Sequence, residues 1–212
     1  YQEVTGVQTC ALPICTKHMN DATKHNLNKI LLIISGGISA YKSLELLRLL
    51  KKDNIETPSI LTKGGREFIT ELSIGALSGF PVYTDLFSLK DEQEMGHIEL
   101  SRANDMIVVA PASANLIAKM AHGMADVLAS TVLLASNKPI HLFPAMNPAM
   151  WENPATQENI ERLKKRGINI HMPEAGEMAC GETGVGRLPS PEKMNAIIKN
   201  EIGRASCRER VS

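Results

Sequence analysis

Cys180 carries a thiol, a reactive side chain, and the sequence around it indicates a role in proton transfer or nucleophilic chemistry in this 212-residue chain. It lies in PEAGEMACGETGVGRLPSP, where four glycines fall within eleven residues. Glycine-rich segments form loops and flaps, whereas an unreactive buried cysteine is typical of a strand or helix. We therefore predict a working thiol on a mobile flap. An incidental loop cysteine is the alternative.

His97 and Asn147 carry functional groups suited to proton transfer and to anion binding. His97 stands in GHIELSR after an acidic stretch. An imidazole exchanges protons near neutral pH, although a lone histidine is more often a surface or capping residue. Asn147 stands in FPAMNPAMWENPATQ, whose three prolines predict a rigid, poorly helical segment. A rigidly held amide can clamp a carboxylate or another amide, whereas the neighbouring Met150 and Trp151 are explained by packing.

Two loops have features of a phosphate site. SGGISAYK, residues 35–42, joins an apolar run to a helix through two glycines, which lets backbone N–H groups approach an anion. APASANLIAK, residues 110–119, places serine and asparagine at another helix start. The first loop is neither G-x-G-x-x-G nor a Walker loop, and a tight turn without a ligand explains it equally well. For the second loop, local chemistry alone favours plain N-capping by Ser113 or Asn115. Together they suit a phosphorylated, flat heteroaromatic ligand.

The elements that must position these side chains alternate between short apolar strands and helices. We predict strands at residues 29–34, 57–61, 106–110, 140–143 and 168–171. We predict helices at 39–52, after Gly64-Gly65 through Leu72, at 114–135 with a break near Gly123, at 155–166 and from Pro191 onward. This pattern implies an α/β fold of one domain, a Rossmann-like or flavodoxin-like open parallel sheet with helices on both faces. Ligands bind such sheets beyond the carboxyl ends of the strands.

The two ends of the sequence differ from this pattern. VTGVQTCALPI and EIGRASCRERV show no helical or strand periodicity and resemble translated adapter oligonucleotides of short-read sequencing libraries. We therefore assign residues 1–14 and 201–212 as adapter-like and residues 15–200 as the domain, with ordinary disordered tails as the alternative. Cys10 and Cys207 then drop out of the cysteine count. No metal-ligand pair or disulfide framework remains, so we expect no metal.

Composition excludes several classes of protein. The 23 basic and 23 acidic residues balance, which argues against a nucleic-acid partner bound through a basic face. The longest apolar run, Ile30 to Ile34, is far shorter than the roughly 20 residues that span a bilayer. No secretory signal is visible at the amino terminus. We expect a cytoplasmic protein with neither membrane nor nucleic-acid partners.

Five segments, in this order, resemble the flavin-containing cysteine decarboxylases. SGGISAYK is similar to the family's SGGIAAYK, HIEL carries its histidine, and PASAN is similar to PASANT. PAMNPAMW is similar to PxMNxxMW, and ACGETGVGR to ACGDxGxGR. The resemblance covers about residues 28–198 and is strongest to the N-terminal domain of bifunctional bacterial coenzyme A biosynthesis proteins. Ser39, Leu116 and Glu182 depart from the family pattern, and none of these changes removes a catalytic group.

The resemblance implies a function and a set of site residues. It implies FMN-dependent decarboxylation of 4′-phosphopantothenoylcysteine to 4′-phosphopantetheine and CO2, through thioaldehyde and enethiol intermediates. It assigns His97 as the base and Cys180 as the proton donor. The implied substrate contacts are Asn147, Met146, Ala179, Gly181 and Leu188. The implied FMN contacts are Gly37, Ile38, Ser39, Thr62, Ser113, Ala114, Asn115, Leu116 and Ala145.

The resemblance also implies an assembly and leaves rival functions. It implies a homotrimer or a trimer-based dodecamer, and a phosphopantothenate–cysteine ligase domain fused to this one in some members. Peptidyl-cysteine decarboxylases share the fold but typically lack the flap cysteine, and flavin prenyltransferases lack the flap and the PAMN pairing. A non-catalytic flavin-binding regulator is the alternative of another class. Such paralogues usually lose the equivalent of His97, Asn147 or Cys180, or carry long acidic tails.

Overall fold

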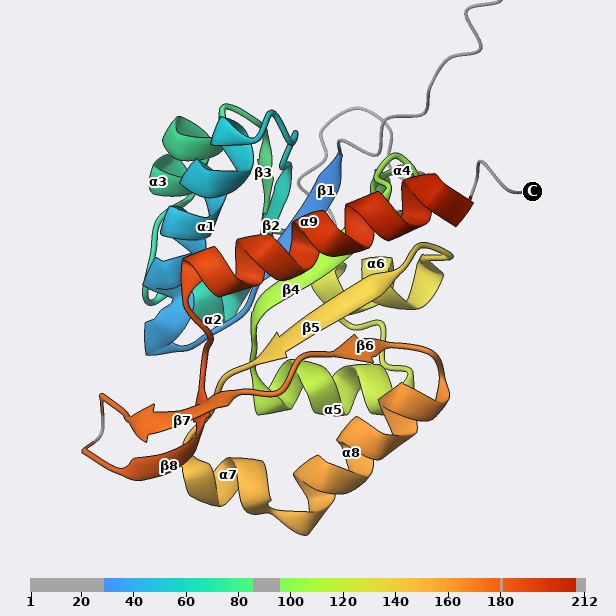
Figure 1. Ribbon diagram of the computed structural model, residues 1–212. Coiled ribbons are helices and arrows are strands. Elements are labelled where there is room, and N and C mark those ends of the chain that lie inside the picture. The colour runs from blue at the N-terminus through green and yellow to red at the C-terminus, as the bar shows by residue number, and fades with distance from the viewer. Residues whose placement is uncertain (1–28, 86–95, 180, 209–212) are drawn as a thin grey trace, which may run out of the picture.

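A six-stranded parallel sheet forms the centre of the molecule (Figure 1). The computed structural model describes residues 29–85, 96–179 and 181–208, without the side chains of His97 and residues 205–208. The strand order is β3-β2-β1-β4-β5-β6, that of a Rossmann fold, which confirms the predicted open parallel sheet. The strands are β1 (Ile30–Ile34), β2 (Ser59–Leu61), β3 (Val82–Tyr83), β4 (Met106–Ala112), β5 (Ile140–Pro144) and β6 (Asn169–Ile170).

The central strands are apolar on both faces because helices cover both. All five residues of β1 are buried, and alternate side chains enter opposite layers of the core. One layer is covered by α1 (Tyr41–Lys52), α3 (Glu71–Ser78) and α9 (Pro191–Arg208). The other is covered by α4 (Gly96–Arg102), α5 (Ala114–His122), α6 (Leu128–Ala135) and α8 (Pro154–Lys165). The chain thus changes sides of the sheet between β1 and β4.

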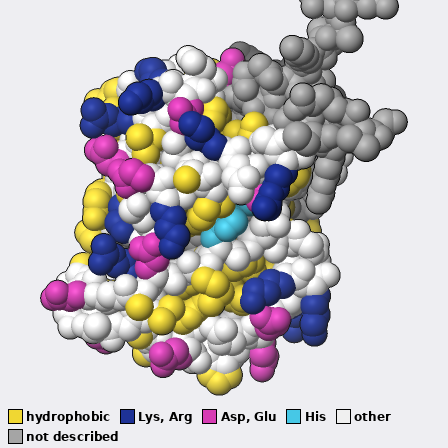
Figure 2. Space-filling view, in the orientation of Figure 1, with side chains coloured by type: hydrophobic (Ala, Val, Ile, Leu, Met, Phe, Trp, Pro, Cys, Tyr) yellow, Lys and Arg dark blue, Asp and Glu magenta, His cyan; other side chains and the backbone are white. Residues whose placement is uncertain are grey.

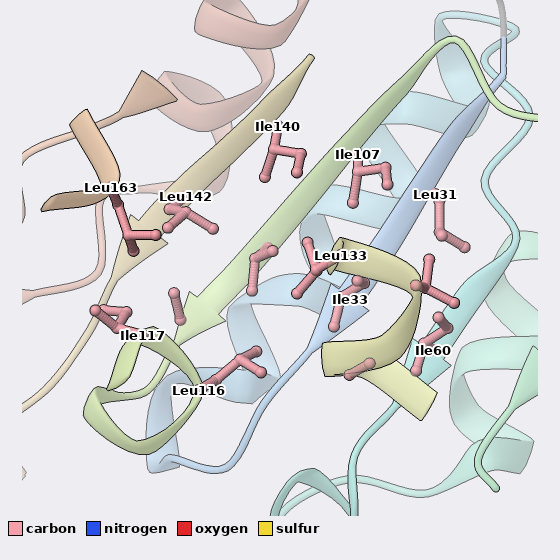
Figure 3. Close-up of a cluster of buried hydrophobic side chains, with 14 of the residues drawn as sticks. Leu31, Ile33, Ile60, Ile107, Leu116, Ile117, Leu133, Ile140, Leu142 and Leu163 are labelled. Atoms are coloured by element: carbon pink, nitrogen blue, oxygen red, sulfur yellow. The ribbon is translucent and has the colours of Figure 1, made fainter. Parts of the chain in front are cut away.

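The core layer beneath α4, α5, α6 and α8 shows how the helices are fixed to the sheet (Figure 3). Leu116 and Ile117 of α5, with Leu133 of α6, point toward the same strand face as Leu31 and Ile107. All five side chains are less than 9% exposed. Burying each contributes about 1.5–3 kcal/mol, so the start of α5 is held rigidly against the sheet.

The glycine-rich segment expected as a flap forms an antiparallel hairpin outside the main sheet. Its strands are β7 (Glu174–Glu177) and β8 (Thr183–Arg187), and Figure 1 shows them projecting beyond the carboxyl end of β5. The hairpin packs directly on the segment after β5, since the N–H of Met146 donates to the carbonyl of Gly186 at 3.0 Å. A Cβ at Gly186 would overlap the carbonyl oxygen of Met146, so only glycine allows this contact.

Local structure differs from the sequence expectation in three places. The helix expected through Leu72 is divided into α2 (Lys63–Arg66) and α3, because the Thr70 hydroxyl caps α3 by accepting from the N–H of Ser73 at 3.1 Å. The strand β3 was not predicted, because two residues are too few to show the alternation of apolar and polar side chains that indicates a strand. The segment expected to be poorly helical forms α7 (Pro148–Glu152), which Asn147 caps.

The last helix continues to Arg208, past the boundary expected at residue 200. Ile202 lies four residues after Ile198 and eight after Met194, and all three pack against the same core layer. The expectation that EIGRASCRERV has no helical periodicity is wrong for its first residues, because the apolar stripe extends one further turn. Assignment of residues 201–212 as adapter-derived stays a prediction, and residues 1–28 lie outside the described chain.

The face of the described residues that Figure 2 shows has no dominant charge. Figure 2 shows lysine and arginine side chains interspersed with aspartate and glutamate on this face. Within residues 29–85, 96–179 and 181–208, no helix is long and apolar enough to cross a membrane. The same residues contain no group of three histidine, cysteine or acidic side chains able to hold a metal ion.

Two stacked histidines connect β5 to the segment after β6. Nδ1 of His141 lies 3.0 Å from Nε2 of His171, and the two rings stack at 5.3 Å between centroids. His141 is only 2% exposed, and its burial, with a smaller effect of His171, lowers its pKa from 6.5 to about 4. Burial also lowers the pKa of His171, against an opposing effect of Glu201.

We predict that the stability conferred by a neutral His141 is lost in acid. Unfolded His141 binds a proton near pH 6.5 and folded His141 only near pH 4, so the free energy of unfolding should fall as pH drops through this window. The expected loss between pH 8 and pH 5 is about 2 kcal/mol, measured by urea unfolding. His141→Gln should flatten this slope, and the control His122→Gln, at an exposed position, should keep it. Equal slopes in wild type and His141→Gln would contradict the prediction.

Candidate active site

Two hollows open at the carboxyl ends of the strands, where the sheet changes sides. The rim pocket, of about 1100 Å³, lies among the loops after β1, β2 and β4. The hairpin pocket, of about 390 Å³, lies between the start of α1, the segment after β5 and the β7–β8 hairpin. Gly36 lines the first and Gly37 the second, so the two share the β1–α1 loop as a wall. Both volumes are large enough for a small molecule.

The hydroxyl of Ser35 fixes the loops on either side of the switch point. Ser35 is 2% exposed and donates to the carbonyl oxygen of Pro111 at 2.7 Å. The Ser35 hydroxyl oxygen in turn accepts from the N–H of Ser113 at 2.8 Å. The end of β1 is thereby joined to the end of β4. A buried N–H without this acceptor would be destabilising by about 1–3 kcal/mol.

Glycine allows the loops after β1 and β2 to touch backbone to backbone. A Cβ on Gly36 would lie 2.9 Å from the carbonyl carbon of Gly64, which real side chains do not tolerate. Gly37 differs, since a Cβ there would meet nothing closer than the Ser39 hydroxyl at 3.9 Å. The backbone is therefore bare on the side of the hairpin pocket, and a flat group can approach it closely.

The rim pocket has donors for a phosphate and apolar walls. The Ser113 hydroxyl accepts from the N–H of Leu116 at 3.4 Å and keeps its own hydrogen to donate. The N–H groups of Ala114 and Asn115, at the start of α5, donate to no acceptor in the described chain. Buried apolar side chains also line the hollow: Ile60, Leu116, Leu128 and Ala129. This donor set fits a phosphorylated planar cofactor such as FMN.

The Asn147 side chain is oriented by its role as a cap. Its Oδ1 accepts from the N–H of Met150 at 2.8 Å, so Nδ2 is left as a donor beside the hairpin pocket. The preceding segment is fixed on both sides, by Ala145 donating to Ala112 of β4 at 3.1 Å and by Met146 donating to Gly186 of β8. A rigid amide donor suits a carboxylate.

Two cations that were not among the predicted site residues, Lys42 and Arg187, line the hairpin pocket. Nζ of Lys42 donates to the carbonyl oxygen of Leu188 at 2.6 Å, which connects α1 to the residue after β8. Burial, and then the charge of Arg187, lower the pKa of Lys42. Both residues stand inside the quoted segments SGGISAYK and ACGETGVGR, so their presence was visible but their shared location was not. Ser35 was missed because nothing in the sequence marks its two partners.

The structure brings together most of the predicted site residues. Those lining the hairpin pocket are Gly37, Ile38, Ser39, Ala145, Met146, Asn147, Ala179 and Leu188. Those lining the rim pocket are Thr62, Ser113, Asn115 and Leu116. Ala114 and Gly181 line neither; Gly181 lies in the hairpin turn, where its N–H donates to Met178 at 2.9 Å. The predicted FMN contacts are thus divided between two hollows that share one loop.

The two predicted catalytic residues are not placed by the structure. His97 is the second residue of α4, and its side chain lies outside the described residues. Cys180 also lies outside the described residues, between Ala179 of the hairpin pocket and Gly181. Their roles stay predictions.

The strand order is that of the Rossmann fold, and the two hollows lie at its switch point, where ligands bind in such sheets. A model of the family described as Flavoprotein matches residues 18–203, and the chain belongs to this family.

Relatives of known structure and sequence agree with this assignment. The chain is 49% identical over 171 residues to the coenzyme A biosynthesis bifunctional protein CoaBC of Vibrio vulnificus, covering 81% of this chain and 43% of that protein. A PPC decarboxylase variant with a cysteine replaced by serine, complexed with pantothenoylaminoethenethiol, superposes with a TM-score of 0.74 at 31% identity, covering 81% and 96% of the two chains. The FMN-binding protein AtHal3 superposes with a TM-score of 0.72 at 31% identity, covering 82% of this chain and 95% of that chain. The chain thus spans about two fifths of the CoaBC length.

We predict that Ser35→Ala weakens cofactor binding and the fold together. Loss of the hydroxyl leaves the Ser113 N–H unsatisfied, so the free energy of unfolding should fall by about 1–3 kcal/mol and FMN should bind at least several-fold more weakly. Urea unfolding and fluorescence titration with FMN measure the two effects. Ser43→Ala is the matched control, because its buried hydroxyl also donates to a carbonyl, that of Ala110 at 2.7 Å, but accepts from no loop N–H. Equal FMN affinity in the two variants would contradict the prediction.

Proposed function

We propose that this chain is an FMN-dependent decarboxylase that converts 4′-phosphopantothenoylcysteine to 4′-phosphopantetheine and CO2 in coenzyme A biosynthesis. The observation that carries the proposal is the pair of hollows sharing the β1–α1 loop, with the free amide of Asn147 at the smaller one. The similarity to CoaBC and to a PPC decarboxylase structure supports it.

The cofactor is held by the loops after β1, β4 and β5. In this proposal the Ser113 hydroxyl and the first N–H groups of α5 bind a phosphate, with Thr62 nearby. The bare backbone of Gly37 and the apolar side chains of Leu116 and Ala145 would hold the ring of the cofactor. The chemistry that FMN supplies when bound is two-electron oxidation of the substrate's CH2–SH group and its later reversal.

Asn147 orients the substrate by its carboxylate. Loss of CO2 directly from a cysteine carboxylate would leave an unstabilised carbanion. Once the CH2–SH group is a thioaldehyde, the C=S group lies β to the carboxylate and accepts the electrons of the breaking bond, giving an enethiol. A neutral donor such as Asn147 Nδ2–H positions the carboxylate without stabilising its charge as strongly as a cation would. Buried Met146 and Leu188 keep water from this end of the pocket.

Proton transfer is assigned to His97 and Cys180. His97 takes a proton during the oxidation. Cys180 gives one during the reduction to the enethiol carbon that lost CO2, next to the carbon that bears sulfur. The position of Cys180 after Ala179, which lines the hairpin pocket, supports the second assignment. The serine variant of the PPC decarboxylase relative complexed with an aminoethenethiol supports it as well.

The proposal includes a homotrimer or a trimer-based dodecamer, and a fused phosphopantothenate–cysteine ligase domain in the intact gene. The bifunctional relatives support the fused domain. Exposed apolar side chains at the rim pocket and just before it, Val127 at 39% and Met124 at 46%, are consistent with a neighbouring subunit.

We predict that the purified chain, reconstituted with FMN, shows the visible absorbance of a bound flavin and forms 4′-phosphopantetheine. The rim donors should hold the flavin through gel filtration, and turnover is followed by mass spectrometry. Asn147→Asp should retain the flavin but lose at least 100-fold in kcat/KM, because a second carboxylate repels that of the substrate. A chain that stays colourless, or an Asn147→Asp variant with wild-type turnover, would contradict the proposal.

We predict that Cys180→Ser completes the oxidation and CO2 loss but not the final reduction. Serine is a far weaker acid than cysteine, so the enethiol should accumulate with a mass two hydrogens below that of 4′-phosphopantetheine. Cys15→Ser is the matched control and should give the normal product. Full formation of 4′-phosphopantetheine by Cys180→Ser would remove this thiol from the mechanism.

A further inference from the structure

The hairpin pocket has more positive than negative charge among its lining residues. Lys42 from α1 and Arg187 from β8 line it, against a single carboxylate, that of exposed Glu177. These two cations come from opposite ends of the described chain, and the fold places them on one cavity. The function proposed above uses neither.

Lys42 forms no ion pair with the described residues, although the charges of Glu174 and Glu192 favour its charged form. One N–H of its ammonium donates to the Leu188 carbonyl at 2.6 Å, and an ammonium has three such donors. The charge of Arg187 disfavours the charged form of Lys42, so the two cations lie close enough to repel. An anion between them would relieve that repulsion.

Arg187 is likewise without a carboxylate partner among the described residues. Glu174 lies opposite it in the hairpin register but forms its ion pair with Lys193, Nζ to Oε1 at 2.7 Å. A Cβ on Gly176 would lie 3.0 Å from Nη1 of Arg187, so the guanidinium runs over the bare backbone of β7. Its fork of donors is left for a ligand.

We propose that Lys42 and Arg187 bind the phosphate monoester of the substrate and select it over the unphosphorylated compound. This inference rests on the proposed function, whose substrate carries a carboxylate at one end and a phosphate at the other. Cations that held the reacting carboxylate would stabilise it against loss of CO2, whereas the phosphate keeps its charge throughout. The neutral Asn147 amide and the cation pair are therefore matched to different ends of one molecule.

Turnover of two substrates by the FMN-loaded full chain tests this assignment. Wild type should have a higher kcat/KM for 4′-phosphopantothenoylcysteine than for pantothenoylcysteine. Arg187→Gln and Lys42→Met should each reduce that ratio about ten- to a hundredfold, the effect of one charge-assisted hydrogen bond. Arg187→Lys should keep part of the preference. Lys199→Gln is the matched control, because this exposed cation is paired with Asp53 and does not line the pocket, and it should keep the wild-type ratio.

Equilibrium binding separates this inference from the proposed function. By calorimetry, 4′-phosphopantetheine should bind wild type more tightly than pantetheine does, and Arg187→Gln should remove most of the difference. If wild type turns over neither substrate but this binding result holds, the proposed function fails and the phosphate site stands. An unchanged preference in Arg187→Gln, in turnover and in binding, would overturn the phosphate site. Because Arg187 is exposed, its replacement should leave the fold intact, which thermal unfolding checks.

Discussion

The buried hydroxyl of Ser35 donates to the carbonyl of Pro111 and accepts from the N–H of Ser113, and so fixes the ends of β1 and β4 to each other. These strands are the neighbours between which the chain changes sides of the sheet. Without this connection the β1–α1 loop would not be a fixed wall, and the two hollows would not keep their spacing. In the proposed function both cofactor and substrate contact this loop, and transfer between them requires close and constant approach.

A second set of contacts joins the hairpin to this frame. Met146 donates to Gly186, and Lys42 reaches the carbonyl of Leu188, so the segment after β5 and the start of α1 both hold the residues around β8. The hairpin therefore belongs to the pocket although it lies outside the main sheet. Asn147 is ordered by the same frame, since capping α7 occupies its oxygen and leaves its N–H groups available.

Much of the fold follows from local sequence. Continuous apolar runs such as Ile30–Ile34 predict buried parallel strands, and the loops after these strands are the predicted site. Partners distant in sequence could not be predicted: nothing marks Pro111 and Ser113 as the partners of Ser35, or Lys42 and Arg187 as neighbours. The break before α3 was not predicted because the Thr70 cap competes with continuation of the helix. Ile202 extends the apolar stripe of α9 into a segment whose sequence otherwise resembles an adapter translation.

Release of CO2 from substrate labelled with 13C in the cysteine carboxylate tests the central claim most directly. The account predicts labelled CO2 from the FMN-loaded chain, in an amount matching the substrate consumed, and none from the same chain stripped of flavin. No labelled CO2 from the loaded chain, or equal release with and without flavin, would contradict it.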